Sequence, residues 1–277
     1  MLLQKLKPDA LRSEGCVVGL LATCELQGKD YTNHLSADER AQYMHLPNRS
    51  RKSQWLAGRL AAKYLFLSRL EMGEGTCSRA WPPTLARLSS EALDAYSSWM
   101  YQRIEVLLNG VTPSRYRKLT WCGKDRPESI SLSHAGGECC ASIAMGPPTA
   151  VDVETIVPRI DAFYRSNFTK AERSWVGCGA EGDSVKANWF FTLLWSLKES
   201  ALKLGWLDSL WNLPSIEISG LPGPKSIGPF GCGKTNDFVV FAARVKEQCR
   251  VMPVRVAVTG TSNFILTVVN PQSGAVN

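Results

Sequence analysis

The residues between Asn48 and Leu70 predict one long helix, and this helix constrains the fold more than any other segment. Four apolar side chains recur at helical spacing and predict a buried stripe: Leu56, Leu60, Tyr64 and Leu67. From Arg40 to Leu70 there is no acidic residue, and there are seven basic ones: Arg40, Arg49, Arg51, Lys52, Arg59, Lys63 and Arg69. Because Lys52, Arg59 and Lys63 fall on a neighbouring stripe, we expect the helix to present its positive charge on one side.

The composition is typical of a soluble globular protein. The chain has 277 residues, of which 44% are hydrophobic and 21% charged, which excludes disordered, collagen-like and coiled-coil chains. The 32 basic and 25 acidic residues leave a net charge of +7, so an anionic partner is expected. A basic nucleic-acid-binding protein is therefore one hypothesis.

The sequence predicts neither a membrane span nor a zinc site. No stretch of about 18 apolar residues occurs, and the short apolar run Cys16–Cys24 is interpreted as a first strand rather than part of a signal peptide. A cytoplasmic location is expected. The nine cysteines include no Cys-x-x-Cys pair and there are three histidines, which favours reduced thiols over metal ligands.

Helix-like and strand-like segments alternate along the chain, which indicates an α+β or α/β fold. Further helices are predicted over Ala37–Tyr43, Ser89–Leu108, Ala162–Trp175 and Ala187–Leu204. Strands are predicted over Val17–Thr23, Ile130–Leu132, Cys140–Ala144 and Thr149–Glu154, with a second small sheet within Ile216–Val269. Gly228–Thr235 matches the Walker A pattern, but a hairpin turn is expected there, because a phosphate loop needs a hydrophobic strand before it and a helix after it.

A set of carboxylates and lysines marks a candidate site. Asp152 and Glu154 are two residues apart on a predicted strand, so both point to the same face. Glu199 and Lys203 are four apart on a predicted helix and share one side of it, and Lys198 is adjacent to Glu199. Three converging carboxylates would suit Mg²⁺ holding a substrate phosphate. Structural ion pairs on an amphipathic helix are the alternative. If the carboxylates do bind Mg²⁺, an Mg²⁺-dependent phosphotransferase is one enzyme hypothesis.

His134 comes directly after a short predicted strand and precedes the pair Gly136 and Gly137. With Ser133 before it, this segment could present ring, hydroxyl and backbone donors to an anion. A purely structural histidine is the alternative.

Several segments, in order, resemble the surfactin-synthetase-activating type of 4′-phosphopantetheinyl transferases. They are Ser131–His134, Ala150–Glu154 and Trp195–Lys203, with Asn167–Arg173, Ala57–Leu60 and Gly123–Lys124 as supporting matches. The spacing also fits, since 18 residues separate His134 from Asp152 and 47 separate Asp152 from Glu199. Five or six motifs in order are more specific than any one of them.

The sequence departs from the family pattern in two places. Asp125 stands where the family's Gly-Lys-Pro segment has its proline, and the 65 residues from Gly58 to Gly123 are more than in shorter members. The extra length lies within Glu71–Lys118. A helical surface insert is expected there, with a partner-contact element as the alternative.

The resemblance implies a reaction and a set of catalytic residues. The phosphopantetheine arm of coenzyme A would move to a serine of an apo acyl or peptidyl carrier protein, leaving adenosine 3′,5′-bisphosphate. By motif, Asp152, Glu154 and Glu199 would hold Mg²⁺. Glu199, or a water bound to the metal near it, would be the base, and Lys203 and Lys198 would neutralise phosphate charge. Glu172 matches a position near the metal, with helix capping or an ion pair as the alternative.

The resemblance also implies cations for the phosphates of coenzyme A that lie away from the metal. The candidates are Arg49, Arg51, Arg59, Lys124, Ser133 and His134. Arginine suits phosphate because its planar guanidinium donates two hydrogen bonds at once. Part of the basic charge is expected to steer an acidic helix of the carrier.

The family fold is a pseudo-twofold pair of similar halves, each a small antiparallel sheet packed on a long helix, with the active site in the cleft between them. By motif order, residues 1–148 form the N-terminal half, with the insert at 71–118, and residues 149–277 the C-terminal half. A monomer is expected, because one chain holds both halves. The family signature outweighs the nucleic-acid hypothesis, which leaves the carboxylate–lysine set unexplained.

Overall fold

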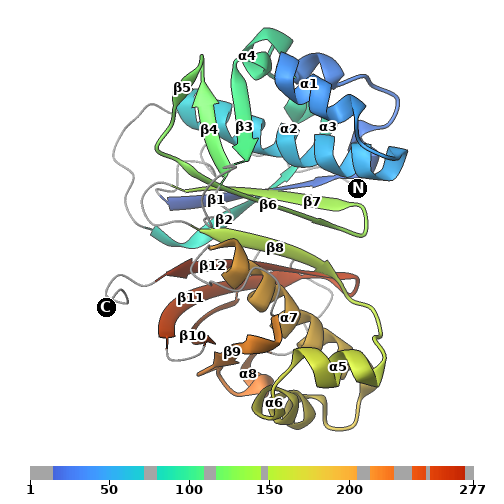
Figure 1. Cartoon of the computed structure of the whole chain (residues 1–277), viewed down its shortest axis with the longest axis vertical. Coiled ribbons are helices and arrows are strands. Elements are labelled where there is room, and N and C mark those ends of the chain that lie inside the picture. The colour runs from blue at the N-terminus through green and yellow to red at the C-terminus, as the bar shows by residue number, and fades with distance from the viewer. Residues whose placement is uncertain are drawn as a thin grey trace. The chain divides into compact units, whose positions relative to one another are not determined.

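The computed structural model describes residues 15–71, 80–108, 117–144, 149–204, 213–227, 239–247 and 250–271. Over these residues the chain forms two compact units that divide between Thr149 and Ala150, named the N-terminal and C-terminal units (Figure 1). The Walker A match Gly228–Thr235 lies outside the described residues. The mixture of helices and largely antiparallel sheets is that of an α+β protein.

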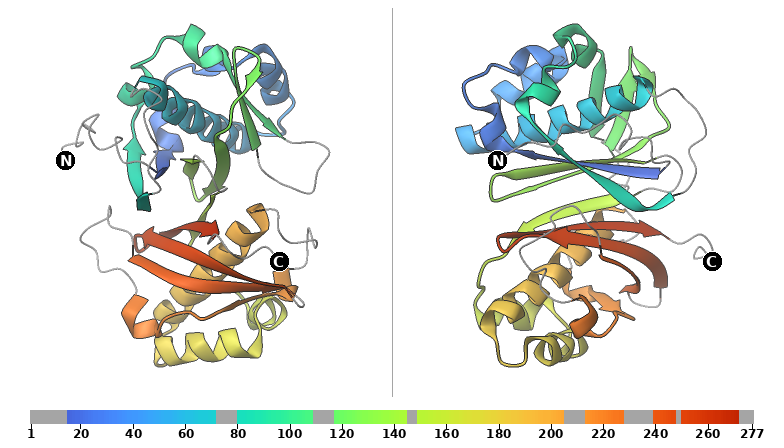
Figure 2. Two further views of the ribbon diagram at one scale, coloured as in Figure 1. Left: turned by 90° about the vertical axis from the view of Figure 1, so that its left-hand side faces the viewer. Right: turned by 180° about the vertical axis from the view of Figure 1, so that it is seen from behind.

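The N-terminal unit is a mixed sheet covered by α2 (Arg49–Glu71). Its strands are β1 (Gly15–Ala22), β2 (Ala80–Leu88), β3 (Ile104–Leu108), β4 (Arg117–Trp121), β5 (Lys124–Asp125), β6 (Ser129–Ala135) and β7 (Glu138–Ala144). Their order is β2-β1-β7-β6-β4-β3, with β5 on β4, and among these strands only β2 joins in parallel. Figure 2 shows α2 lying along this sheet in both views.

The apolar stripe of α2 builds the core of the N-terminal unit. Leu56, Leu60 and Leu67 are buried and Tyr64 packs against the same cluster, so the predicted helix and its stripe are confirmed. Before α2 lie two short 3-10 helices, η2 (Thr23–Leu26) and η3 (Thr32–His34), and then α1 (Ala37–Met44). The predicted helix Ala37–Tyr43 is therefore confirmed as well.

The predicted helix over Ser89–Leu108 is wrong. The chain instead forms α3 (Ser90–Leu93), α4 (Ser98–Gln102) and strand β3. Ser89 caps α3, since its hydroxyl accepts the Ala92 N–H at 3.3 Å. In β3, buried Ile104 and Val106 alternate with Glu105 at the period of a strand. Tyr101 and Leu93 lie in the core, so the described part of the insert is not simply a surface helix.

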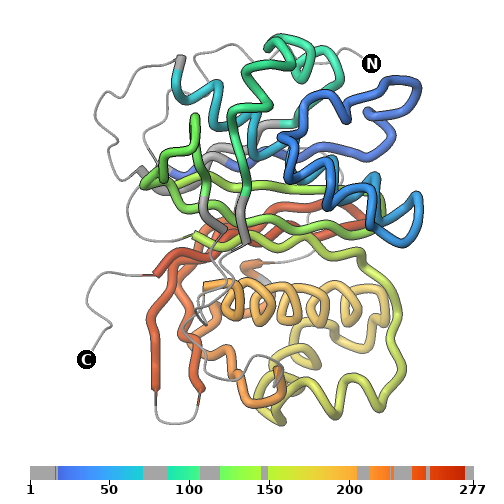
Figure 3. Tube along the Cα trace, turned by 45° about the horizontal axis from the view of Figure 1, so that its top comes forward, coloured from blue at the N-terminus to red at the C-terminus, as the bar shows by residue number. Residues whose placement is uncertain are grey.

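The C-terminal unit is a five-stranded antiparallel sheet packed on one long helix. Its strands are β8 (Ala150–Thr155), β9 (Ile216–Ser219), β10 (Val239–Glu247), β11 (Arg250–Gly260) and β12 (Phe264–Pro271), in the order β8-β12-β11-β10-β9. Its helices are α5 (Asp161–Asn167), α6 (Lys170–Ala180), α7 (Ser184–Lys203) and α8 (Pro224–Ile227), with the short 3-10 helix η4 (Leu213–Ser215). Helix α7 packs on β8 and β12 and runs as one continuous helix in Figure 3.

The prediction of a single helix over Ala162–Trp175 is wrong, and the reason is local. The chain breaks at Phe168, and Thr169 starts the new helix α6 as its N-cap in a capping box with Glu172. The predicted helix Ala187–Leu204 is confirmed as α7, with Asp183 as its N-cap.

The two units share one topology. In each, the first strand pairs with the last, and the antiparallel paths β1-β7-β6-β4-β3 and β8-β12-β11-β10-β9 have the same chain order. In each, the long helix, α2 or α7, lies between the first two strands of the path in chain order, which are β1 and β3 or β8 and β9, whereas the short α8 follows β9. The N-terminal unit adds β2, α3 and α4 between α2 and β3. No helix of the described residues is long and apolar enough to cross a membrane.

We expect Leu193→Ala to lower the free energy of unfolding by about 2–5 kcal/mol, because it leaves a cavity beneath α7. Leu193 is fully buried, whereas Val185 on the same helix is exposed. Val185→Ala is the matched control and should change the stability by about 0.5 kcal/mol or less. Urea denaturation of both variants measures this, and equal losses would contradict the packing of α7 on its sheet.

Candidate active site

Strand β8 turns Asp152 and Glu154 toward α7. Asp152 is the register partner of Thr267 on β12, so the two side chains point to the same face. The Thr267 hydroxyl lies 2.8 Å from the Ser196 hydroxyl and 3.0 Å from that of Ser200, both on α7. The predicted placement of both carboxylates on one face is therefore confirmed, and that face is covered by α7.

Lys203 and Asp152 come together, although they are 51 residues apart. The Lys203 ammonium donates to Asp152 Oδ1 at 2.7 Å and to the Val151 carbonyl at 3.1 Å. Asp152 is 2% exposed, while the side chain of Lys203 is 22% exposed. The ammonium thus neutralises a buried carboxylate, while the side chain that carries it remains partly exposed.

Glu154 shows how the three carboxylates act on one another. Burial, together with the negative charges of Asp152 and Glu199, raises its pKa to about 7 against the lowering effects of Lys203 and Arg159. Like charges at a shared site favour the protonated form, so an added cation would be stabilised here.

The donor set suits Mg²⁺, which prefers carboxylate oxygens. Asp152, Glu154 and Glu199 supply three such groups from β8 and α7. Within the described parts of the chain, however, no group of three or more His, Cys, Asp or Glu is gathered closely enough to hold a metal ion. One of the predicted ligands, Asp152, is instead paired with Lys203.

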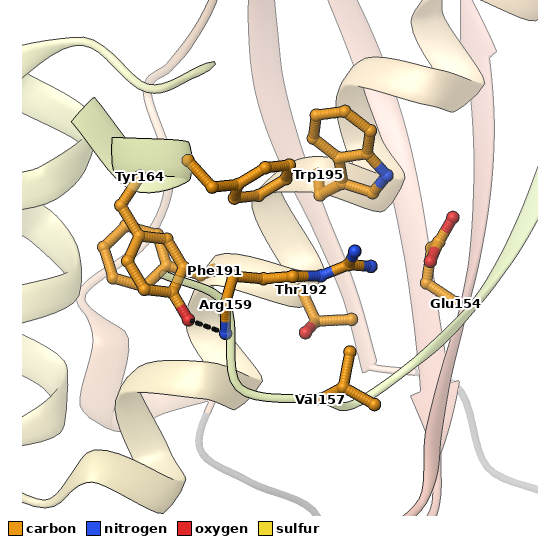
Figure 4. Close-up of a pocket in the computed structure, with 8 residues that line it drawn as sticks. Glu154, Val157, Arg159, Tyr164, Phe191, Thr192 and Trp195 are labelled. Atoms are coloured by element: carbon orange, nitrogen blue, oxygen red, sulfur yellow. Dashed lines mark hydrogen bonds between the residues drawn. The ribbon is translucent and has the colours of Figure 1, made fainter. Parts of the chain in front are cut away.

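An aromatic pocket adjoins Glu154, and no sequence motif pointed to it. Tyr164 stacks on Phe191 with ring centres 4.0 Å apart, and the Arg159 guanidinium lies 5.2 Å from the centre of the Phe163 ring. Figure 4 shows the Arg159 side chain extending across this pocket toward Glu154. The Tyr164 hydroxyl fixes the loop, because it accepts the Arg159 backbone N–H at 2.9 Å.

In the N-terminal unit the structure brings Arg51 and His134 together. The Arg51 Nη1 lies 2.8 Å from His134 Nε2 on the surface, and since a guanidinium can only donate, Nε2 is the acceptor in this contact. The first turn of α2 orients Arg51, whose backbone N–H donates to Asn48 Oδ1 at 2.8 Å. Arg49 and Lys124 are exposed and Ser133 is half-buried.

Two basic residues of α2, Arg59 and Lys63, are buried. The expectation that the helix presents its positive charge on one side is therefore wrong for these two residues. Arg59 is 3% exposed, stacks 3.5 Å above the Trp55 ring and lies 3.8 Å from Glu39. Lys63 is fully buried and pairs with the same carboxylate. Arg59 is thus a structural residue rather than a surface cation that could bind coenzyme A.

Lys198 is likewise an interior residue. Its ammonium donates to Glu172 Oε2 at 2.9 Å and to the Asn167 carbonyl at 2.7 Å, and both charged side chains are fully buried. The expectation that Lys198 neutralises a phosphate is corrected, since no phosphate reaches a buried ammonium whose partners are in place. For Glu172, the alternative of helix capping and an ion pair is confirmed.

Comparison with known proteins supports the resemblance to the phosphopantetheinyl transferases. The family model of the 4′-phosphopantetheinyl transferase superfamily matches residues 148–227, a range that contains Asp152, Glu154, Glu199 and Lys203. A search of curated proteins finds no match to the chain. The chain resembles this superfamily, and the match supports phosphopantetheinyl transfer in general terms, with coenzyme A and a carrier protein as the partners the superfamily implies.

We expect the stability of the metal-free protein to depend on pH through Glu154. Its pKa rises from 4.5 to about 7 on folding, so the folded state binds the proton more tightly and stability falls as pH rises between these values. Glu154→Gln should therefore raise the melting temperature at pH 8 and have little effect below pH 4.5. Thermal melts with a chelator present measure this, and an equal gain at both pH values would refute it.

Proposed function

We propose that the chain transfers the 4′-phosphopantetheine arm of coenzyme A to a serine of an apo acyl or peptidyl carrier protein. One observation carries this proposal. Lys203 contacts the buried Asp152 beside Glu154 and Glu199, within the residues that match the superfamily model. Three carboxylates that could hold a metal ion, with the lysine side chain of Lys203 partly exposed beside them, suit a reaction in which negative charge develops on a phosphate leaving group.

The reaction balances as a displacement at phosphorus. The serine hydroxyl oxygen bonds to the phosphorus that bears the pantetheine, and the bond from that phosphorus to the bridging oxygen breaks. Adenosine 3′,5′-bisphosphate leaves with the bond's electrons, and the serine proton passes to a base. Glu199 is our first choice for that base. Its negative charge helps to raise the pKa of Glu154, which shows that the two carboxylates are close, and its side chain is half-buried.

Asp152, Glu154 and Glu199 are the residues that would hold Mg²⁺. When bound, the ion would supply positive charge to the pyrophosphate. Lys203, whose side chain is partly exposed and whose ammonium contacts Asp152, would neutralise charge on the phosphates. Arg159 crosses the pocket beside Glu154 and provides a further cation for an acidic carrier.

Arg51 and His134 are the pair we assign to phosphates of coenzyme A distant from the reacting one. Their contact brings a guanidinium and an imidazole to one surface point from α2 and β6. Arg49, Lys124 and Ser133 are further candidates. The proposal retains the expected pseudo-twofold pair of halves with a cleft between them, a monomer, Mg²⁺ and a cytoplasmic location. Its carriers would be those of fatty-acid, polyketide or nonribosomal peptide synthesis.

The test incubates the protein with an apo carrier, coenzyme A and Mg²⁺ and measures the carrier's mass. We expect a gain equal to the phosphopantetheine arm, and we expect Glu199→Gln to slow transfer about 100-fold or more, because the base and one carboxylate are lost. Glu91→Gln, a change at an exposed carboxylate of the N-terminal unit, is the control. No gain with any of several apo carriers would refute the proposed function.

Arg51→Ala should raise the KM for coenzyme A about tenfold, since one charged contact to phosphate is lost, and leave the KM for the carrier within about twofold. Arg69→Ala, at the opposite end of α2, is the control. Steady-state kinetics with each substrate varied in turn measures both constants. A larger effect on the carrier KM would assign Arg51 to carrier recognition instead.

A further inference from the structure

A buried carboxylate–lysine pair ties together four elements of the C-terminal unit. We call Glu172 and Lys198 the C-terminal clamp. Glu172 Oε2 accepts the Thr169 N–H at 2.8 Å and the Lys198 ammonium at 2.9 Å, while Oε1 accepts the Ile218 N–H at 2.8 Å. Lys198 also donates to the Asn167 carbonyl at 2.7 Å. The end of α5, the start of α6, helix α7 and strand β9 thus meet at one ion pair.

The N-terminal unit repeats these contacts, although its lysine has a further acceptor, the Tyr101 carbonyl at 3.1 Å, and its carboxylate also lies 3.8 Å from Arg59. We call Glu39 and Lys63 the N-terminal clamp. Glu39 Oε2 accepts the Ser36 N–H at 3.2 Å and the Lys63 ammonium, while Oε1 accepts the Val106 N–H at 3.2 Å. Lys63 also donates to the His34 carbonyl at 3.1 Å. In both units the carbonyl that accepts from the lysine comes two residues before the N-cap, Ser36 or Thr169. The backbone N–H that binds Oε1 comes from the strand at the far end of the shared path, β3 or β9.

The two clamps differ in the residues that come after their lysines. Tyr64 comes after Lys63, and it packs on Tyr96. Glu199 comes after Lys198, and Lys203 stands one turn further along the same helix. A buried ammonium held by a carboxylate and a carbonyl fixes the rotation of its helix, since any turn would break several hydrogen bonds at once. In the C-terminal unit that rotation also sets the direction in which Glu199 and Lys203 point.

We propose that Glu172 and Lys198 are positioning residues for the reaction, holding α7 so that Glu199 and Lys203 face Asp152. This inference rests on the proposed function for its kinetic part. Neither clamp residue touches the substrates, because both side chains are fully buried. The C-terminal clamp therefore acts on turnover through α7, whereas the N-terminal clamp orients α2, which carries Arg51 but neither Glu199 nor Lys203.

The test compares Lys198→Met with Lys63→Met, which remove a buried ammonium from corresponding positions in the two units. We expect both variants to lower the melting temperature. Lys198→Met should also lower kcat about 10- to 100-fold, with the KM for coenzyme A within about threefold, because reacting groups are misplaced while the substrate still binds. Lys63→Met should leave kcat within about threefold of the wild type.

A second measurement does not depend on activity. Mn²⁺ is titrated into each protein alone and its binding is monitored by electron paramagnetic resonance. We expect Lys198→Met to weaken Mn²⁺ binding about tenfold, as loss of a ligand's support does, and Lys63→Met to leave it unchanged. If Lys198→Met does not fold, Glu172→Gln and Glu39→Gln are compared by the same criteria.

The outcomes separate this inference from the proposed function. Equal effects of the two variants on kcat and on Mn²⁺ binding would overturn the positioning role, as would a loss confined to the KM for coenzyme A. A wild-type chain that binds Mn²⁺ but modifies no carrier would refute the transferase, and the metal titration would then decide the positioning role. A wild-type chain that binds no Mn²⁺ would overturn both.

Discussion

The structure depends on a lysine buried within each long helix. An ammonium taken out of water is strongly destabilising unless a carboxylate and other acceptors surround it. Lys63 and Lys198 are both fully buried, and their desolvation alone would lower their pKa values, an effect that the paired Glu39 and Glu172 oppose. Each unit must therefore bring a helix N-terminus, a long helix and a strand to one point. The sheet order and the packing of α2 and α7 satisfy that requirement.

The side chains of the candidate site lie beside one of these buried pairs and differ from it in their environment. Lys198 is enclosed, whereas the side chain of Lys203, further along α7, is partly exposed and hydrogen-bonded to Asp152. Two lysines five residues apart on one helix thus have different physical roles. Burial distinguishes them: Lys198 is enclosed with its acceptors, whereas the side chain of Lys203 is partly exposed, and we propose the positioning role for the first and phosphate neutralisation for the second.

The sequence was sufficient to predict the long helices and the shared face of Asp152 and Glu154, because both depend on a single period within one segment. It did not reveal that Arg59 and Lys63 are interior, because their partner Glu39 precedes the acid-free stretch and lies on another helix. The prediction of a single helix over Ser89–Leu108 failed for a different reason. Its apolar residues fit a helical spacing, yet the last of them alternate as β3, and the pairing of β3 with β4 decided the outcome. The pocket at Arg159 and Tyr164 depends on contacts between segments, which no local pattern encodes.

The repeated topology leaves the two units under unequal constraint. Both keep the fold and its buried ion pair, but the three carboxylates and the accessible lysine belong to the C-terminal unit alone. If the candidate site residues of the C-terminal unit perform the reaction, the N-terminal unit needs no such residues. It should therefore tolerate substitutions that would abolish activity in the C-terminal unit. The addition of β2, α3 and α4 stands in the N-terminal unit. Sequence drift should accordingly be fastest around these elements and slowest along β8 and α7, which gives a direct expectation for how relatives of this chain diverge.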